Sequence, residues 1–252
     1  MKFKLAVGAS FGAVFIASLV VHIPASWLWQ HAPKIKGLAL EGITGTPWQG
    51  GAANVRWQNQ PFGRLQWDMR LGRLLHGELA FDVRFGKGSE WQLQGQGLVG
   101  YSSSGPFAEK LLLSMPAYQA VSQAQLPVPI TVKGNLELTV RNYHYAAPYC
   151  KTLDATLAWV QGAAETPMGT IKPGPVFADL NCANGAVIAK INQASANVSS
   201  DWQANLATNQ QYTLNGWFKP GADFPDGLAK QLKWLGDPNT KGQYKLDYSG
   251  RL

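Results

Sequence analysis

The chain has 252 residues, of which 46% are hydrophobic and 15% charged, and its formal net charge is +7. The charged fraction lies well below the roughly 25% of an average soluble domain, while 27 glycines and 10 tryptophans are high counts, so the composition excludes a disordered chain and favours short strands joined by glycine turns. The basic residues are scattered without a run of five, which argues against a nucleic-acid partner.

The N-terminal segment predicts a membrane anchor. Residues 5–28 are apolar or small and contain no Asp, Glu, Lys or Arg, and about 20 residues suffice to cross a bilayer. Lys2 and Lys4 precede this run, so the positive-inside rule keeps residues 1–4 in the cytoplasm, and Trp27 and Trp29 fit an aromatic belt at the membrane interface. We therefore expect residues 29–252 outside the cytoplasm, in the periplasm.

The alternative interpretation of this segment is a cleaved signal peptide. A basic start and an apolar stretch that ends near residues 24–26 resemble one. However, Ile23, Pro24 and Ala25 match the A-x-A cleavage pattern poorly, and the apolar run exceeds the usual 7 to 15 residues. The anchor is the interpretation that we carry forward.

Four segments of the outer region share one pattern, a glycine followed by alternating apolar and polar residues, which predicts half-buried strands. They are residues 77–85, 134–140, 185–191 and 242–248. Further strands are expected at residues 52–57, 65–70, 91–94, 154–160, 201–207 and 212–218. The short spacing favours antiparallel neighbours, so the predicted fold is mainly β, with antiparallel, curved sheets that could be duplicated.

Two short helices are predicted, at residues 106–114 and 227–235. Residues 115–129 contain Pro116, Pro127 and Pro129 among Ala, Ser and Gln, which marks a crossover. The periplasmic region thus has candidate halves at residues 36–115 and 130–252.

Cys150 and Cys182 are the two cysteines of the chain, separated by 32 positions. In an oxidising compartment a disulfide is the expected state, with two buried free thiols as the alternative. A zinc site lacks partners at C-x-x-C or His spacing.

None of the candidate catalytic motifs stands in the sequence context that its chemistry requires. Residues 95–100 match G-x-G-x-x-G, but a turn rather than a helix follows, and no acidic residue stands about twenty positions on. Residues 100–105 are one residue too long for a G-x-S-x-G elbow. Glu78 and Asp82 share a strand face with Arg84 and are explained as a solvated face. We expect no enzyme activity, no catalytic residue, no metal, no cofactor and no small-molecule substrate.

Three short stretches and the cysteine pair together resemble a known family. The stretches are Gly45-Thr46-Pro47-Trp48-Gln49-Gly50-Gly51-Ala52, Leu65-Gln66-Trp67-Asp68 and Gly77-Glu78-Leu79, followed by Cys150, Cys182 and the ending from Leu235-Gly236 to Gly242-Gln243-Tyr244. In order and length the chain resembles protein N of the type II secretion system.

The resemblance implies a structural component of the inner membrane that supports export of folded proteins from the periplasm of Gram-negative bacteria across the outer membrane. Its implied partners are other inner-membrane or periplasmic subunits of that system and the lipid bilayer. The family also looks related to envelope proteins of the AsmA kind, which supplies an alternative function, a β groove that binds or transfers lipid.

The candidate interaction or packing motif is formed by Gly45, Thr46, Trp48 and Gly50. We expect Trp48 to pack beneath the turn at residues 50 and 51; the alternative is that Trp48 anchors a partner. Edge strands are a second candidate surface, because their unpaired backbone groups can add a partner strand.

Overall fold

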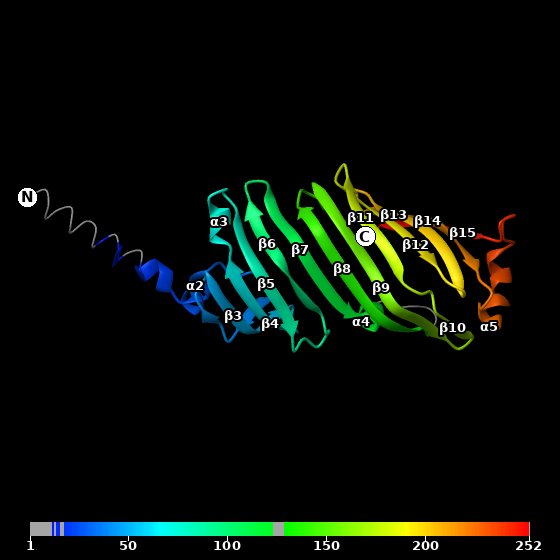
Figure 1. Ribbon diagram of the computed structural model, residues 1–252, viewed down its shortest axis with the longest axis horizontal. Helices are drawn as coiled ribbons and strands as arrows, with labels where there is room; N and C mark the ends of the chain where they lie inside the picture. The colour runs from blue at the N-terminus through cyan, green and yellow to red at the C-terminus, as the bar shows by residue number, and fades with distance from the viewer. Residues whose placement is uncertain (1–11, 13, 16–17, 123–128, 252) are drawn as a thin grey trace, which may run out of the picture.

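The computed structural model describes residues 12, 14–15, 18–122 and 129–251. All strands of this part belong to one antiparallel sheet of 15 strands. The sheet is elongated, with α2 beside its first strands at one end and β15 at the other (Figure 1). The predicted class, mainly β with antiparallel pairing and short helices, is confirmed.

The element bounds are as follows. The strands are β1 (Leu38–Glu41), β2 (Thr44–Gly45), β3 (Gln49–Trp57), β4 (Gln60–Met69), β5 (Leu79–Lys87), β6 (Gln94–Ser102), β7 (Gly105–Pro116), β8 (Thr131–His144), β9 (Thr152–Thr166), β10 (Gly169–Ile171), β11 (Val176–Ala183), β12 (Ala186–Ala194), β13 (Val198–Leu206), β14 (Gln211–Pro220) and β15 (Tyr244–Arg251). The helical segments are α2 (Ala25–His31), α3 (Leu71–Leu74), α4 (Ala117–Ser122), α5 (Asp226–Ala229) and the 3₁₀ turn η1 (Leu232–Leu235).

Strand pairing follows chain order along almost the whole sheet, in the order β1-β3-β4-β5-β6-β7-β8-β9-β11-β12-β13-β14-β15, with β2 beside β3 and β10 beside β9. The crossover does not interrupt it, because β7 pairs with β8 and places Leu113 opposite Leu138. The candidate halves thus contribute to one continuous sheet. Residues 123–128 of the predicted crossover lie outside the described residues.

The four alternating segments all form strands, namely β5, β8, β12 and β15. In β5 the predicted apolar side, Leu79, Phe81, Val83 and Phe85, follows the two-residue period of a strand. In β8 a bulge at Gly134 interrupts the ladder. Gly134 has φ +92°, and a Cβ there would lie 2.5 Å from Val160 O, so this close approach of two backbones requires glycine.

Two predictions in the first half of the chain are wrong. Residues 106–114, predicted as a helix, lie in β7, because the strand pairs with β6 on one side and β8 on the other. The apolar run at residues 111–113 has no periodicity that separates a helix from a strand. Residues 91–93, predicted as part of a strand, lie in the connection before β6, which starts at Gln94. In the second half, residues 227–235 are helical in two short pieces, α5 and η1.

The predicted anchor is interrupted near its end. Residues 18–22 are helical, Ile23 and Pro24 are not, and α2 begins at Ala25. Pro24 lacks an N–H and disfavours helical geometry at the residue before it, so one continuous helix through residue 28 is wrong. Within the described residues, none of the helices combines the length and the hydropathy needed to cross a membrane. Residues 5–11, 13, 16 and 17 of the predicted anchor lie outside this part.

The buried core is small for a chain of this length. Most of the buried hydrophobic residues in the described part are alanines, and the larger ones are Met69, Phe107 and Val140. One sheet without a second layer across its face cannot enclose large side chains, so its apolar residues stay half-buried. The sheet is therefore a surface of broad area rather than the wall of an enclosed site.

Candidate interaction surface

The motif at residues 45–50 is a tight turn between β2 and β3. Thr46 N donates to Gln49 O at 2.9 Å, and Gln49 N donates back to Thr46 Oγ1 at 3.2 Å. Gly45 has φ +81°, and a Cβ there would lie 2.5 Å from Gln49 O, so the turn needs glycine at this position. Thr46 and the two glycines thus shape the turn itself.

The indole that supports this turn belongs to Trp67 on β4. Its Nε1 donates to Thr46 O at 3.1 Å, and a Cβ on Gly50 would lie 2.8 Å from Trp67 Cζ2. Gly50 is therefore small because Trp67 occupies the space beside it. The strand pairing of Gly50 with Trp67 explains why this indole lies beside the turn, and the expectation that Trp48 also packs beneath it stays a prediction.

Trp48 connects the sheet to the apolar N-terminal segment. Its main-chain oxygen accepts a hydrogen bond from Met69 N at 2.7 Å, and its Nε1 donates to Val20 O at 3.3 Å. In a regular helix Val20 O would accept from the N–H four residues later, which is Pro24 and has none. Trp48 thus satisfies a carbonyl that the proline leaves without its helical donor.

The two tryptophans of the expected interface belt lie on α2. Trp27 is 52% exposed and Trp29 is half-buried. The Trp27 ring lies 4.5 Å from the His31 ring, centre to centre, and His31 Nδ1 lies 2.8 Å from Trp27 O. An exposed indole beside the apolar segment is what the membrane-interface prediction requires, and that role stays a prediction.

Cys150 and Cys182 form a disulfide, as the sequence predicted. Cys150 lies in the connection between β8 and β9 and is 1% exposed, while Cys182 is near the end of β11. The bond therefore fixes the β8–β9 connection to a strand on the far side of β9. Tyr143 supports the same connection, because its hydroxyl donates to Tyr149 O at 2.7 Å, and burial raises the pKa of this phenol.

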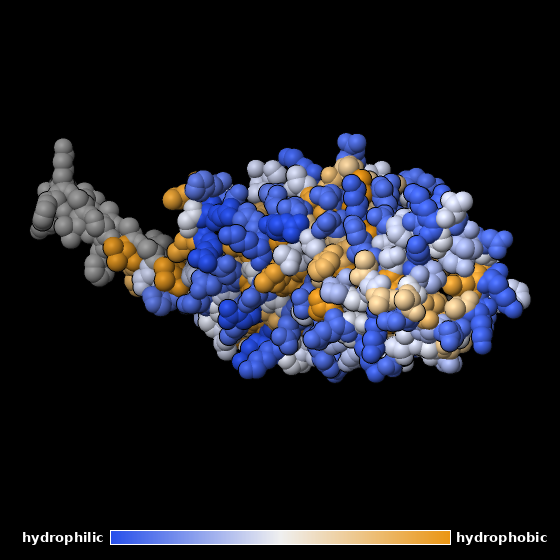
Figure 2. Space-filling view, turned by 45° about the vertical axis from the view of Figure 1, so that its right-hand side comes forward, coloured by the Kyte–Doolittle hydropathy of each residue, from blue (hydrophilic) through white to orange (hydrophobic). Residues whose placement is uncertain are grey.

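One side of the sheet from β7 to β15 is apolar. The strand registers place on it residues that follow the two-residue period through eight neighbouring strands. This apolar face consists of Leu111, Leu113, Leu136, Leu138, Val140, Leu157, Trp159, Leu180, Val187, Ile191, Trp202, Leu206, Leu214, Phe218, Tyr244, Leu246 and Tyr248. Figure 2 shows hydrophobic residues exposed among hydrophilic ones across the middle of the molecule.

The apolar face is hollowed towards its end. A cavity of about 310 Å³ lies over β12 to β15 against Val187, Leu214 and Tyr248. A second, of about 560 Å³, lies between the sheet and the α5–η1 segment, where Phe218 and Trp234 line it. Trp234 remains 78% exposed. These hollows suit apolar contacts and offer no cluster of polar groups for chemistry.

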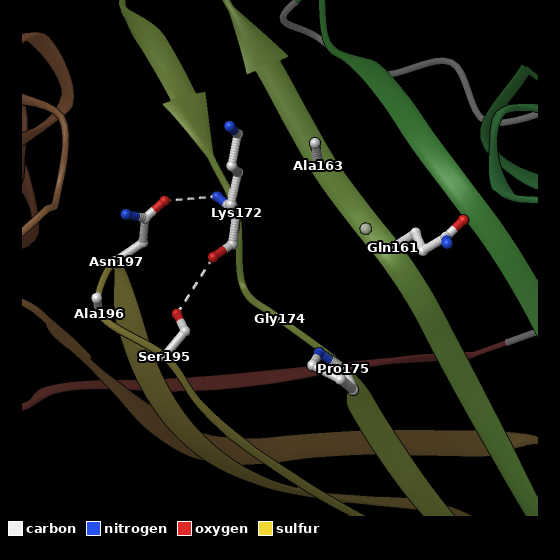
Figure 3. Close-up of a pocket in the computed structure, with 9 residues that line it drawn as sticks. Gln161, Ala163, Lys172, Gly174, Pro175, Ser195, Ala196 and Asn197 are labelled. Atoms are coloured by element: carbon white, nitrogen blue, oxygen red, sulfur yellow. Dashed lines mark hydrogen bonds between the residues drawn. The ribbon is translucent and has the colours of Figure 1, made fainter.

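A third cavity, of about 630 Å³, lies between β9 and the connections around it (Figure 3). Its polar groups hold loops together, since Asn197 Oδ1 accepts from Lys172 N at 2.7 Å and Ser195 Oγ donates to Lys172 O at 3.2 Å (Figure 3). β9, which carries Gln161 and Ala163, lies on the opposite side of the opening. No acid–base pair lines this cavity, which is a crevice between connections.

Glu78, which precedes β5, and Asp82 within β5 lie in separate ion pairs. Arg73 donates hydrogen bonds to Glu78 at 2.7 Å and to Glu109 at 2.5 Å, and these bonds to the two carboxylates raise the pKa of its guanidinium. Asp82 pairs with Arg70. Glu78 and Asp82 are thus each neutralised by an arginine, and within the described residues no group of three or more His, Cys, Asp and Glu could hold a metal ion.

The two edges of the sheet differ. At the first edge β1 has four residues and β2 has two, and the pairing of β3 with β4 contains bulges. At the last edge β15 has eight residues, pairs with β14 without a bulge, and contains no proline. Short and irregular strands discourage further pairing, whereas a long, regular one permits it. The sequence indicated that edges mattered and could not say which strand forms one.

Comparisons with known proteins identify relatives over the whole chain. The family described as type II secretion system (T2SS), protein N, matches residues 36–247. Relatives named type II secretion system protein N include those of Vibrio cholerae serotype O1, 43% identical over 252 residues, and of Aeromonas hydrophila, 32% identical over 255 residues; in both, all of each chain is covered. That of Pectobacterium carotovorum subsp. carotovorum is 25% identical over 252 residues. No solved structure gives a significant match.

Proposed function

Because this chain belongs to the family of type II secretion system protein N, we propose that it is a structural component of that system in the inner membrane, supporting export of folded proteins from the periplasm across the outer membrane. The observation that carries the proposal is the extent of the match. Residues 36–247 begin before β1 and end within β15, so the family relation covers essentially the entire sheet.

The proposed topology places residues 1–4 in the cytoplasm, residues 5–28 in or at the inner membrane, and residues 29–252 in the periplasm. Lys2 and Lys4 before an uncharged segment support this orientation. The disulfide supports an oxidising compartment for the sheet. The bond from Trp48 to Val20 O joins the sheet to the apolar segment and supports a position of the sheet near the membrane surface.

In this role the chain presents surface rather than chemistry. Thirteen strands joined edge to edge make a long platform, and one of its sides is apolar from β7 to β15. The proposed partners are other inner-membrane or periplasmic subunits of the secretion system, which would bind the apolar face or a sheet edge. Half-exposed apolar residues give such contacts their driving force.

The alternative function is a groove that binds or transfers lipid. It rests on one observation, the open apolar face with its hollows of about 310 and 560 Å³. The names of the relatives favour the secretion component instead. The two proposals predict different binding partners for the apolar face. The first predicts subunits of the secretion system, and the second predicts the acyl chains of lipids.

The test is purification of the tagged full chain from native membranes, with mass spectrometry of co-purifying proteins and of extracted lipids. We expect secretion subunits without stoichiometric phospholipid. In parallel, deletion of the gene should leave exported proteins in the periplasm, and the full chain should restore their release into the medium. Stoichiometric phospholipid without secretion subunits, together with normal export in the deletion strain, would refute the proposal.

A further inference from the structure

The free edge strand β15 has a sequence that is complementary to itself. Its central residues read Tyr244-Lys245-Leu246-Asp247-Tyr248, with a cation and an anion placed symmetrically about Leu246. Among the strands of the described sheet β15 pairs with β14 alone, so its other edge faces no strand. Such an edge is a template for one more strand.

We propose that β15 pairs with β15 of a second copy of this chain, antiparallel and centred on Leu246. In this register Lys245 lies opposite Asp247 of the second copy, and Asp247 lies opposite its Lys245. Tyr244 lies opposite Tyr248, and the two Leu246 residues face each other across the two-fold axis. Each copy contributes the same patch, as a two-fold interface requires.

The side chains support the pairing on both sides of the sheet. Leu246 and Tyr248 are 38% and 62% exposed and belong to the apolar face, so aromatic and aliphatic pairs would join the apolar faces of the two copies into one. Lys245 and Asp247 are exposed on the opposite side, across from Trp217 and Asn215 of β14. Neither charge takes part in an ion pair within the described residues, so both are available to a partner strand.

Other registers are disfavoured by the same residues. Moving the axis by one residue, to position 245 or 247, places two lysines or two aspartates directly opposite each other, and like charges there are destabilising. Centring the axis between two residues pairs the apolar side of one strand with the polar side of the other. Arg251 would face position 241 of the second copy, which precedes the strand and lies outside the ladder.

Single cysteines test the geometry in the full chain, purified in detergent and oxidised under mild conditions. Directly opposed residues of antiparallel strands lie about 4.5 to 5.5 Å apart between Cα atoms, within the range of a disulfide. Leu246→Cys is therefore expected to give a covalent dimer that a reductant dissociates. Tyr248→Cys, on the same side of the same strand, is the matched control, because its two copies would lie about 13 Å apart along the strands.

Charge variants test the register independently. Lys245→Glu and Asp247→Lys each place like charges in both pairs, and we expect each to weaken self-association at least about tenfold in analytical ultracentrifugation. An equimolar mixture of the two variants restores opposite charges in both pairs and should recover dimerisation. Lys230→Glu makes the same charge change at an exposed site outside the strands and should leave association unchanged.

The outcomes separate this proposal from the proposed function. Crosslinking of Leu246→Cys but not of Tyr248→Cys, with recovery in the charge mixture, supports the paired edge. A monomeric full chain, equal crosslinking of both cysteine variants, or an edge occupied by a different protein overturns it. The secretion role can hold in each of these cases, because its test measures export and co-purifying subunits.

Discussion

Replacing both cysteines by alanine removes the covalent link between the β8–β9 connection and β11. The two cysteines are 32 positions apart, so the bond closes a loop that contains β9, β10 and most of β11. In the chain-entropy description, closing a loop of this length stabilises the fold by about 3.7 kcal/mol, because it restricts the unfolded chain. Alanine is the better replacement, since serine would bury a hydroxyl at position 150, which is 1% exposed.

The assay is urea denaturation of the chain followed by tryptophan fluorescence. With a denaturant dependence of about 2 to 3 kcal/mol per M, the loss moves the midpoint down by about 1 to 2 M. The wild type under reducing conditions should unfold near the double variant, whereas the double variant should not respond to the reductant. This comparison isolates the bond from other effects of the reductant.

Equal midpoints for the oxidised wild type and the Cys150→Ala/Cys182→Ala variant would refute the reasoning. Thiol titration of the unfolded, unreduced wild type provides a second check, and we expect no reactive thiol. Two titratable thiols would show that the cysteines stay free, the alternative that the sequence left open.

Three further predictions concern single residues. Gly50→Ala forces a Cβ to within 2.5 Å of a backbone oxygen and should destabilise the sheet by about 1 to 3 kcal/mol in urea denaturation, whereas Gly72→Ala, with nothing within 4 Å, should not destabilise it. Trp48→Phe keeps an aromatic ring but removes the hydrogen bond to the apolar segment. Limited proteolysis between α2 and β1 should therefore become faster, while the urea midpoint of the sheet changes little. An unchanged cleavage rate would contradict the role of the indole. A hydrogen bond from Arg141 lowers the pKa of Asp154 in the folded state, so the pair stabilises the fold at any pH above the pKa that this carboxyl has in the unfolded chain. The difference in urea midpoint between the wild type and Asp154→Asn should therefore shrink as the pH falls below about 4.

Local alternation was sufficient to find much of the sheet. The residues after Gly134 and Gly242 alternate strictly, and the two-residue period of a strand is a property of the backbone that needs no distant partner. The same method failed at residues 106–114, where consecutive leucines fit a helix or a buried strand equally well. Pairing with β6 and β8 decided that segment as a strand.

In the motif at residues 45–50, too, the local sequence indicated one part of the structure and strand pairing decided the other. Its glycines and threonine marked a turn, because the residue types that permit a tight turn are visible in the sequence. The roles of the two tryptophans were not visible. Trp67 supports the turn because β4 pairs with β3, and Trp48 meets Val20 because the chain brings residues 28 positions apart together.

By itself, then, the sequence determined the β character, the cysteine pair, the apolar N-terminal segment and the family resemblance, all of which rest on residue types at short spacing or in fixed order. The tertiary structure decided that the strands form one sheet, that its apolar side stays open from β7 to β15, and that β15 is left at a free edge. These features depend on which strands become neighbours. Long-range pairing is set by the whole chain, and no local pattern encodes it.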